Sequence, residues 1–155
     1  MPLRRGAELP SLAGATEWIN GETTRESLLG SPCLIHFWSL SCYICKNNLP
    51  ALAAWKTKYG LLGLKVIAVH MPRSEDETNV ELVKQSMLEH GITESCAIDN
   101  MHDVKDAFLN EAGFVPHYYV FNADGILESR AAGDAPGREP QSPACCQSVG
   151  VNCYF

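Results

Sequence analysis

Two short apolar runs stand out along the chain, and each predicts a strand that is buried on both faces. The runs are CLIHFWS at residues 33–39 and LKVIAVHM at residues 64–71. A strand with one face in water would alternate apolar and polar side chains, and these runs do not. Both contain aromatic or β-branched residues, which favour extended backbone. We therefore expect two central strands of a sheet.

Between these runs and after them, the apolar residues recur at helical spacing. The spacing predicts helices over residues 42–59, 76–90 and 101–113, and one helical turn within residues 23–30. Short strands are expected within residues 16–21 and 96–99, and a hairpin over 117–131 that turns at residues 122–125. Strands that alternate with helices before a closing hairpin predict an α/β domain, with a central mixed β-sheet flanked by helices.

Composition divides the chain into three parts. Residues 1–13 are small and polar and predict a mobile N-terminal arm. Residues 14–133 hold all the predicted elements and form the expected domain. Residues 134–155 contain three prolines and have no apolar period, which predicts an irregular tail. The change is abrupt enough to suggest a truncated or frameshifted C-terminus.

The charge balance excludes some functions. The net charge of −6, with no cluster of Lys and Arg, argues against nucleic-acid binding. The chain shows no secretory signal and no apolar stretch that could cross a membrane. We expect a monomer that is cytoplasmic as written, and an exported form whose signal has been trimmed would look the same. An apolar fraction of 46% in 155 residues is enough for one packed core.

The candidate chemistry lies in a CxxC pair, Cys42 and Cys45, directly after the first apolar run. A cysteine attacks only as its thiolate, and a free thiol with a pKa of about 8.5 is mostly protonated at neutral pH. At the start of a helix, unpaired N–H groups and the helix dipole favour the anion of Cys42. Cys45 lies one turn further and is expected to be more enclosed. These positions predict that Cys42 attacks a disulfide and that Cys45 resolves the mixed disulfide.

Other interpretations of the same pair remain open. A metal-binding or metal-delivery module would use both thiolates, but one CxxC supplies two of the four ligands of a closed zinc site. The tail cysteines and the scattered histidines are not at zinc-site spacing, so we assign no metal ligand. A thiol peroxidase-like antioxidant would need a Thr and a Pro where Ser39 and Ile35 stand. Two structural thiols would be an unusual choice at a strand-to-helix junction, and a redox-inactive interaction module has no reason to retain both cysteines.

Two segments resemble landmarks of the thioredoxin superfamily. FWSLSCYICKNNLP is similar to its active-site segment, in which a strand ending in Phe-Trp precedes CxxC and a proline. GFVPHYYVFNADGIL resembles the segment in which a cis-proline precedes a strand and hairpin. WINGETTRESLLGSPCLIHFW and LAAWKTKYGLLGLKVIAVHMPR further resemble the TlpA-like and DipZ-like thiol-disulfide oxidoreductases. The resemblance covers residues 18–133.

This resemblance implies a thioredoxin-like fold and a thiol-disulfide oxidoreductase that contributes to cell redox homeostasis. It implies that Cys42 and Cys45 form a redox-active disulfide and that no organic cofactor is needed. The peptide bond before Pro116 would be cis, the backbone of Val115 would pair with a substrate segment, and Trp38 would cover the disulfide. The expected partners are protein thiols and disulfides and a redox partner protein.

The chain also departs from that pattern. Many TlpA-like proteins have a carboxylate three residues after the second cysteine, where this chain has Asn48, and thioredoxins have a buried Asp where it has His36. Our hypothesis is that His36 accepts the proton of Cys45; the alternative is a core histidine with a fixed hydrogen bond. The C-terminal helix of the superfamily is missing here or replaced by the irregular tail. Cys33 and Cys96 are expected to be buried small hydrophobic residues.

Overall fold

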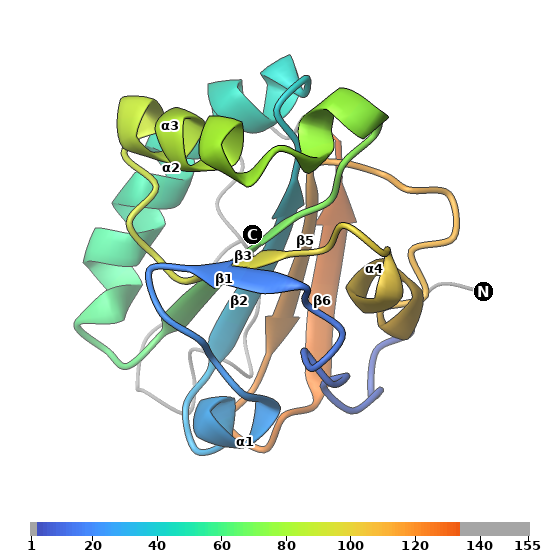
Figure 1. Cartoon of the computed structure of the whole chain (residues 1–155). Helices are drawn as coiled ribbons and strands as arrows, with labels where there is room; N and C mark the ends of the chain where they lie inside the picture. Colours follow the sequence, from blue (N-terminus) through green and yellow to red (C-terminus); the bar gives the residue numbers. More distant parts are fainter. Residues whose placement is uncertain (1–2, 134–155) are drawn as a thin grey trace.

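The computed structural model describes residues 3–133, which form a six-stranded mixed sheet flanked by helices (Figure 1). The elements in chain order are β1 (Glu17–Ile19), α1 (Arg25–Leu28), β2 (Cys33–Trp38), α2 (Tyr43–Gly60), β3 (Lys65–His70), the 3₁₀ turn η1 (Glu75–Thr78), α3 (Val80–His90), β4 (Cys96–Ile98), α4 (Asp103–Ala107), β5 (His117–Phe121) and β6 (Leu127–Ala132). The strand order is β1-β4-β3-β2-β5-β6. Strands β2, β3 and β4 run parallel, and the other pairings are antiparallel. The predicted fold class is confirmed.

Every residue of β2 is buried, because helices or loops cover both faces of the sheet at its centre. On one face Phe37 packs edge-to-face against Phe108 and Tyr119. On the other face, which α2 and α3 cover in Figure 1, Leu34 and Trp38 belong to two further apolar clusters. The centre of the sheet is thus a rigid support for the loop that follows the carboxyl end of β2 and leads to Cys42.

Two predicted helices are shorter in the structure. The helix expected over residues 76–90 is divided at Asn79, where the backbone is extended. The Asn79 side chain caps α3 by accepting the Glu81 N–H. The helix expected over 101–113 ends at Ala107, and Leu109 adopts a left-handed conformation with φ of 53°. In both places a short polar side chain offers the backbone a local alternative to the helix: Asn79 before α3, and Asn110 after α4, whose amide bonds the main chain of Phe114.

The prediction of a mobile N-terminal arm is wrong for residues 3–13. Leu3, Leu9 and Leu12 are buried in the apolar cluster on the face of Phe37. The segment also pairs with the final hairpin, since Gly6 N–H donates to the Leu127 carbonyl at 2.8 Å and Leu9 N–H to the Gly125 carbonyl at 2.7 Å. Three leucines separated by small and polar residues have no regular period, so the pattern gave no sign of this packing.

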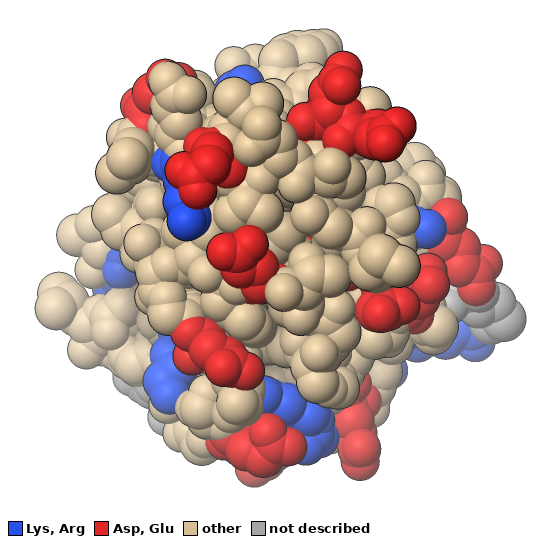
Figure 2. Space-filling model, viewed as in Figure 1, with Lys and Arg blue, Asp and Glu red and all other residues tan. Residues whose placement is uncertain are grey.

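The predicted irregular tail, residues 134–155, lies outside the described residues. Within residues 3–133, no helix combines the length and apolar character needed to cross a bilayer. Cys33 and Cys96 are both buried, as expected. Figure 2 shows Asp and Glu side chains spread over the face seen in Figure 1, with Lys and Arg in small groups among them. This face has no broad basic surface of the kind that binds nucleic acid.

Candidate active site

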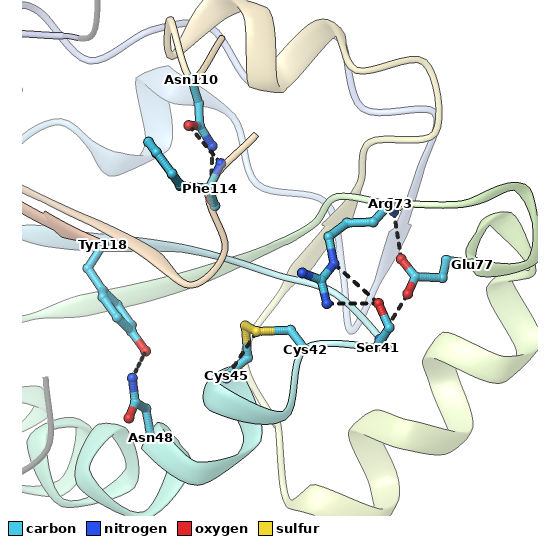
Figure 3. Close-up of a disulfide and its surroundings, with 9 residues drawn as sticks. All are labelled: Ser41, Cys42, Cys45, Asn48, Arg73, Glu77, Asn110, Phe114 and Tyr118. Carbon is cyan, nitrogen blue, oxygen red and sulfur yellow. Dashed lines mark hydrogen bonds between the residues drawn. A yellow bond between two sulfur atoms is a disulfide. The ribbon is translucent and has the colours of Figure 1, made fainter. Parts of the chain in front are cut away.

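Cys42 and Cys45 form a disulfide where β2 leads into α2 (Figure 3). The buried strand ends at Trp38, and Cys42 N–H donates to the Ser39 carbonyl at 3.2 Å, which turns the chain into the helix. Cys42 is the N-cap residue of α2, and its sulfur accepts the Cys45 N–H at 3.1 Å. An N-cap sulfur is close to unpaired N–H groups and to the positive end of the helix dipole, so its thiolate is favoured.

The two cysteines are buried to nearly the same extent, with 3% of Cys42 and 4% of Cys45 exposed. The expectation that Cys45 is the more enclosed of the two is therefore not met in this disulfide form. The asymmetry between them lies in the hydrogen bonding instead, because the Cys42 sulfur receives the N–H of its partner.

Ser41, Arg73 and Glu77 form a polar group beside Cys42 (Figure 3). The Glu77 carboxylate, which is 5% exposed, accepts the Ser41 N–H at 2.9 Å and the Arg73 N–H at 2.6 Å. The Arg73 guanidinium donates to Ser41 Oγ at 2.9 and 3.2 Å. Burial acts to raise the pKa of Glu77, but the hydrogen bonds from Ser41 and Arg73 outweigh it and lower the pKa. Glu77 thus joins the segment after β3 to the loop that precedes Cys42.

A second polar group lies on the inner side of α2. His36 Nε2 is 2.7 Å from Glu94 Oε1, and Lys56 Nζ is 2.6 Å from Glu94 Oε2. The side chains of His36 and Glu94 are 3% and 5% exposed, whereas Lys56 reaches the surface at 24%. Burial would raise the pKa of Glu94, but the bonds and charges of His36 and Lys56 hold it at about 2. The Glu94 carboxylate is therefore ionised and can only accept hydrogen bonds.

A small cavity connects His36 to the disulfide. The cavity has a volume of about 10 Å³, and its lining includes His36, Cys45, Leu49, Pro116 and Tyr118. This volume is close to the space that a single water molecule needs. Asn48, which stands where TlpA-like proteins carry a carboxylate, donates from Nδ2 to the Tyr118 hydroxyl at 3.1 Å. The structure therefore brings His36 and Cys45, nine positions apart in the sequence, to one enclosed space.

The predicted cis bond is found between Val115 and Pro116. The loop before it is held by Asn110, which is 2% exposed; its amide donates to the Phe114 carbonyl at 3.0 Å and its oxygen accepts the Phe114 N–H at 3.2 Å. The Phe114 side chain remains 58% exposed. No hydrogen bond joins the Val115 main chain to another described residue. Sequence reasoning missed Asn110, because nothing in the pattern separates it from an ordinary helix residue.

Trp38 and the two other histidines of the sheet, His70 and His117, have surroundings that differ from those of His36. Trp38 is buried in the cluster that contains both cysteines, and its ring packs edge-on against His70 at 4.9 Å. Neither ring nitrogen of His70 has a hydrogen-bond partner, and burial lowers its pKa to about 4. Burial lowers the pKa of His117 to about 4 as well. His70 and His117 are therefore neutral at pH 7; the nearby charge of Glu77 acts to raise the pKa of His70, but burial outweighs it.

Within residues 3–133 no group of three or more His, Cys, Asp or Glu side chains is arranged to hold a metal ion. The tail cysteines, Cys145, Cys146 and Cys153, lie outside the described residues, so the metal-binding interpretation of the CxxC pair stays untested. The geometry of the two cysteines is that of a disulfide.

Residues 6–130 match the AhpC/TSA family. The chain belongs to this family. It is 47% identical to the thiol-disulfide oxidoreductase YkuV of Bacillus subtilis, over 81% of this chain and 83% of that protein. It is 31% identical to the protein DipZ of Mycobacterium bovis over 76% of this chain, but that match covers only 17% of DipZ.

Solved structures agree with this assignment. The solution structure of a thioredoxin-like protein in the oxidized form superimposes with a TM-score of 0.75 at 45% identity, covering 84% of this chain and 86% of the other. StoA from Bacillus subtilis has a TM-score of 0.62 at 17% identity, covering 96% and 97%, and so shares the fold. Together with the Cys42–Cys45 disulfide, the relatives make this AhpC/TSA family member a thiol-disulfide oxidoreductase of thioredoxin-like fold.

Proposed function

We propose that this AhpC/TSA family protein exchanges disulfides with protein substrates, with Cys42 as the nucleophile and Cys45 as the resolving cysteine. The observation that carries the proposal is the capping of α2 by the Cys42 sulfur, which accepts the Cys45 N–H at 3.1 Å. The same N–H would stabilise a Cys42 thiolate after reduction. The Arg73 guanidinium, bonded to the neighbouring Ser41, adds a positive charge nearby.

The reaction proceeds in two balanced steps. The Cys42 thiolate attacks one sulfur of a substrate disulfide, forms a mixed disulfide and releases the other substrate sulfur as a thiolate. Cys45 then loses its proton to His36 and attacks the Cys42 sulfur. The bond between Cys42 and the substrate breaks, and the electron pair leaves on the substrate sulfur, which takes up a proton. The two electrons come from the Cys42 and Cys45 thiols, which end as the disulfide, so no organic cofactor is required.

Substrate recognition would use the exposed rim of the site. Tyr43 and Phe114, beside Cys42 and before Val115, are 71% and 58% exposed. The main chain of Val115 has no partner among the described residues and can pair with an extended substrate segment, as an added strand does at a sheet edge. A redox partner protein would use the same surface to reset the disulfide.

The test is a glutathione equilibration of the full-length chain in which Cys145, Cys146 and Cys153 are changed to Ser. We expect one two-electron couple, lost in both Cys42→Ser and Cys45→Ser, and a trapped mixed disulfide with a model protein substrate in Cys45→Ser alone. A trap that formed only in Cys42→Ser would reverse the two roles. Stoichiometric zinc binding with no disulfide over the whole glutathione range would favour the metal-delivery interpretation.

The compartment and the direction of electron flow bear on this function as well. A strongly negative potential would fit a reductant in the cytoplasm, where the sequence leads us to expect the chain. An exported protein would be compatible with either direction. The equilibration therefore tests the direction of electron flow and not the location.

A further inference from the structure

Glu94 holds His36 by a bond that fixes which ring nitrogen is basic. The Glu94 carboxylate is ionised, with a pKa of about 2, so it accepts and the His36 Nε2 must carry the hydrogen of the 2.7 Å bond. In a neutral ring the other nitrogen, Nδ1, then has the free lone pair. Carboxylates that hold a catalytic histidine in one tautomer act in this way in other enzymes.

The second oxygen of Glu94 connects this pair to the protein surface. Lys56 donates to it at 2.6 Å and is itself partly exposed. Lys56 and Glu94 line a surface depression of about 230 Å³, together with residues that include Lys46, Pro50 and His90. Cys45, the cavity of about 10 Å³, His36, Glu94 and Lys56 therefore form a continuous series from the disulfide to solvent.

We propose that Glu94 is a positioning residue of the resolving step: with Lys56 it keeps the Nδ1 of His36 free to accept the Cys45 proton. This inference rests on the proposed exchange reaction. Glu94 takes no part in the attack of Cys42, so its removal acts on the second step alone. The proton moves from Cys45 Sγ to His36 Nδ1, across the single water that the cavity can hold, and no other reactant is needed.

The groups that face His36 from the surrounding elements are few. The lysine that lines the cavity of about 10 Å³ is Lys46 from α2, and Tyr118 from β5 stacks beside the His36 ring at a centroid distance of 6.4 Å. Among the described residues, Glu94 is the only carboxylate within ion-pair distance of His36. A change at Glu94 therefore removes the carboxylate that holds the His36 ring.

The test is a single-turnover experiment on the full-length chain that separates the two steps. In Glu94→Gln we expect unchanged formation of the mixed disulfide and a release of substrate thiol from it slowed by about tenfold or more. In the reduced protein, nitrogen-15 NMR of His36 should report hydrogen on Nε2 in the wild type and a changed tautomer population in Glu94→Gln. In a His36→Ala background, Glu94→Gln should slow the second step no further.

Asp99→Asn is the matched control. Asp99 is a fully buried carboxylate at the opposite end of β4 from Glu94, and it accepts the backbone N–H groups of Val104 and Lys105 at 2.9 and 2.8 Å. Equal slowing of both steps in Glu94→Gln, a second step within twofold of the wild type, or the same slowing in Asp99→Asn would each overturn the proposal. If the wild type formed no mixed disulfide at all, the exchange function itself would fail, which is a distinguishable result.

Discussion

Glu77 and Glu94 are both buried carboxylates of the active-site region, but they bind different kinds of partner. Glu77 accepts two backbone N–H groups, of Ser41 and Arg73, and so fixes the course of the chain before Cys42. Glu94 binds two side chains, His36 and Lys56, that lie on β2 and α2. The same residue type thus holds a loop in one place and orients a titratable ring in the other.

The difference shows what decides the role of a buried charge. Backbone N–H groups and a serine hydroxyl do not titrate near neutral pH, so a carboxylate that binds them stabilises geometry. A histidine can gain or lose a proton near neutral pH, so a carboxylate that binds it controls where the proton resides. His70, which has no such partner on either ring nitrogen, illustrates the contrast within the same sheet.

The largest expected effect that separates the two carboxylates is on stability in acid. The pKa of Glu94 is about 2 in the fold against an ordinary value of 4.5. A carboxyl whose pKa is lowered by folding stabilises the fold at pH values above its ordinary pKa. This stabilisation, on the order of 3 kcal/mol, is lost as the pH falls from about 4.5 to about 2. Urea unfolding at a series of pH values should show the wild type losing its advantage over Glu94→Gln in that range. A difference that stayed constant with pH would contradict the ion pair.

A smaller effect is expected from Glu77→Gln. The amide oxygen can accept only part of what the carboxylate accepts, so the loop before Cys42 loses a charge-assisted bond, which costs about 1–3 kcal/mol of unfolding free energy. In contrast with Glu94→Gln, the resolving step should keep its pH dependence. Urea unfolding measures the loss of unfolding free energy, and single-turnover rates at several pH values measure the pH dependence of the resolving step. A changed pH profile in Glu77→Gln, with His36 intact, would remove the distinction between the carboxylates.

The smallest effect is expected from Arg73→Gln. The guanidinium lies at the exposed end of the Glu77 group and favours the Cys42 thiolate, which belongs to the reduced form. Its loss should make the reduction potential of the pair more negative, by less than about 20 mV, because an exposed charge contributes less than about 1 kcal/mol. Glutathione equilibration in low and high salt provides the measurement, and the shift should shrink in high salt. A shift to a less negative potential would contradict the assigned effect of Arg73.

The features of the site that could be predicted are those formed by residues close together in the sequence. The CxxC pair followed from a strand that gives way to a helix, and the cis bond at Pro116 followed from a family resemblance. The same pattern reading failed for residues 3–13, whose leucines have no period, and for residues 101–113, where Asn110 binds the backbone of Phe114 instead of extending a helix. Hydrophobic periodicity reports regular elements and misses single residues with an irregular partner.

The sequence by itself determined the α/β sheet, the position of the disulfide at the end of β2, and the candidacy of His36. Only the tertiary structure decided what surrounds them. Glu94 is 58 positions from His36, and Glu77 is 36 positions from Ser41. The parallel crossings that place β3 and β4 beside β2 bring these residues together. A periodic pattern records how each segment meets the core, whereas a hydrogen bond between distant segments depends on the packing of the whole sheet.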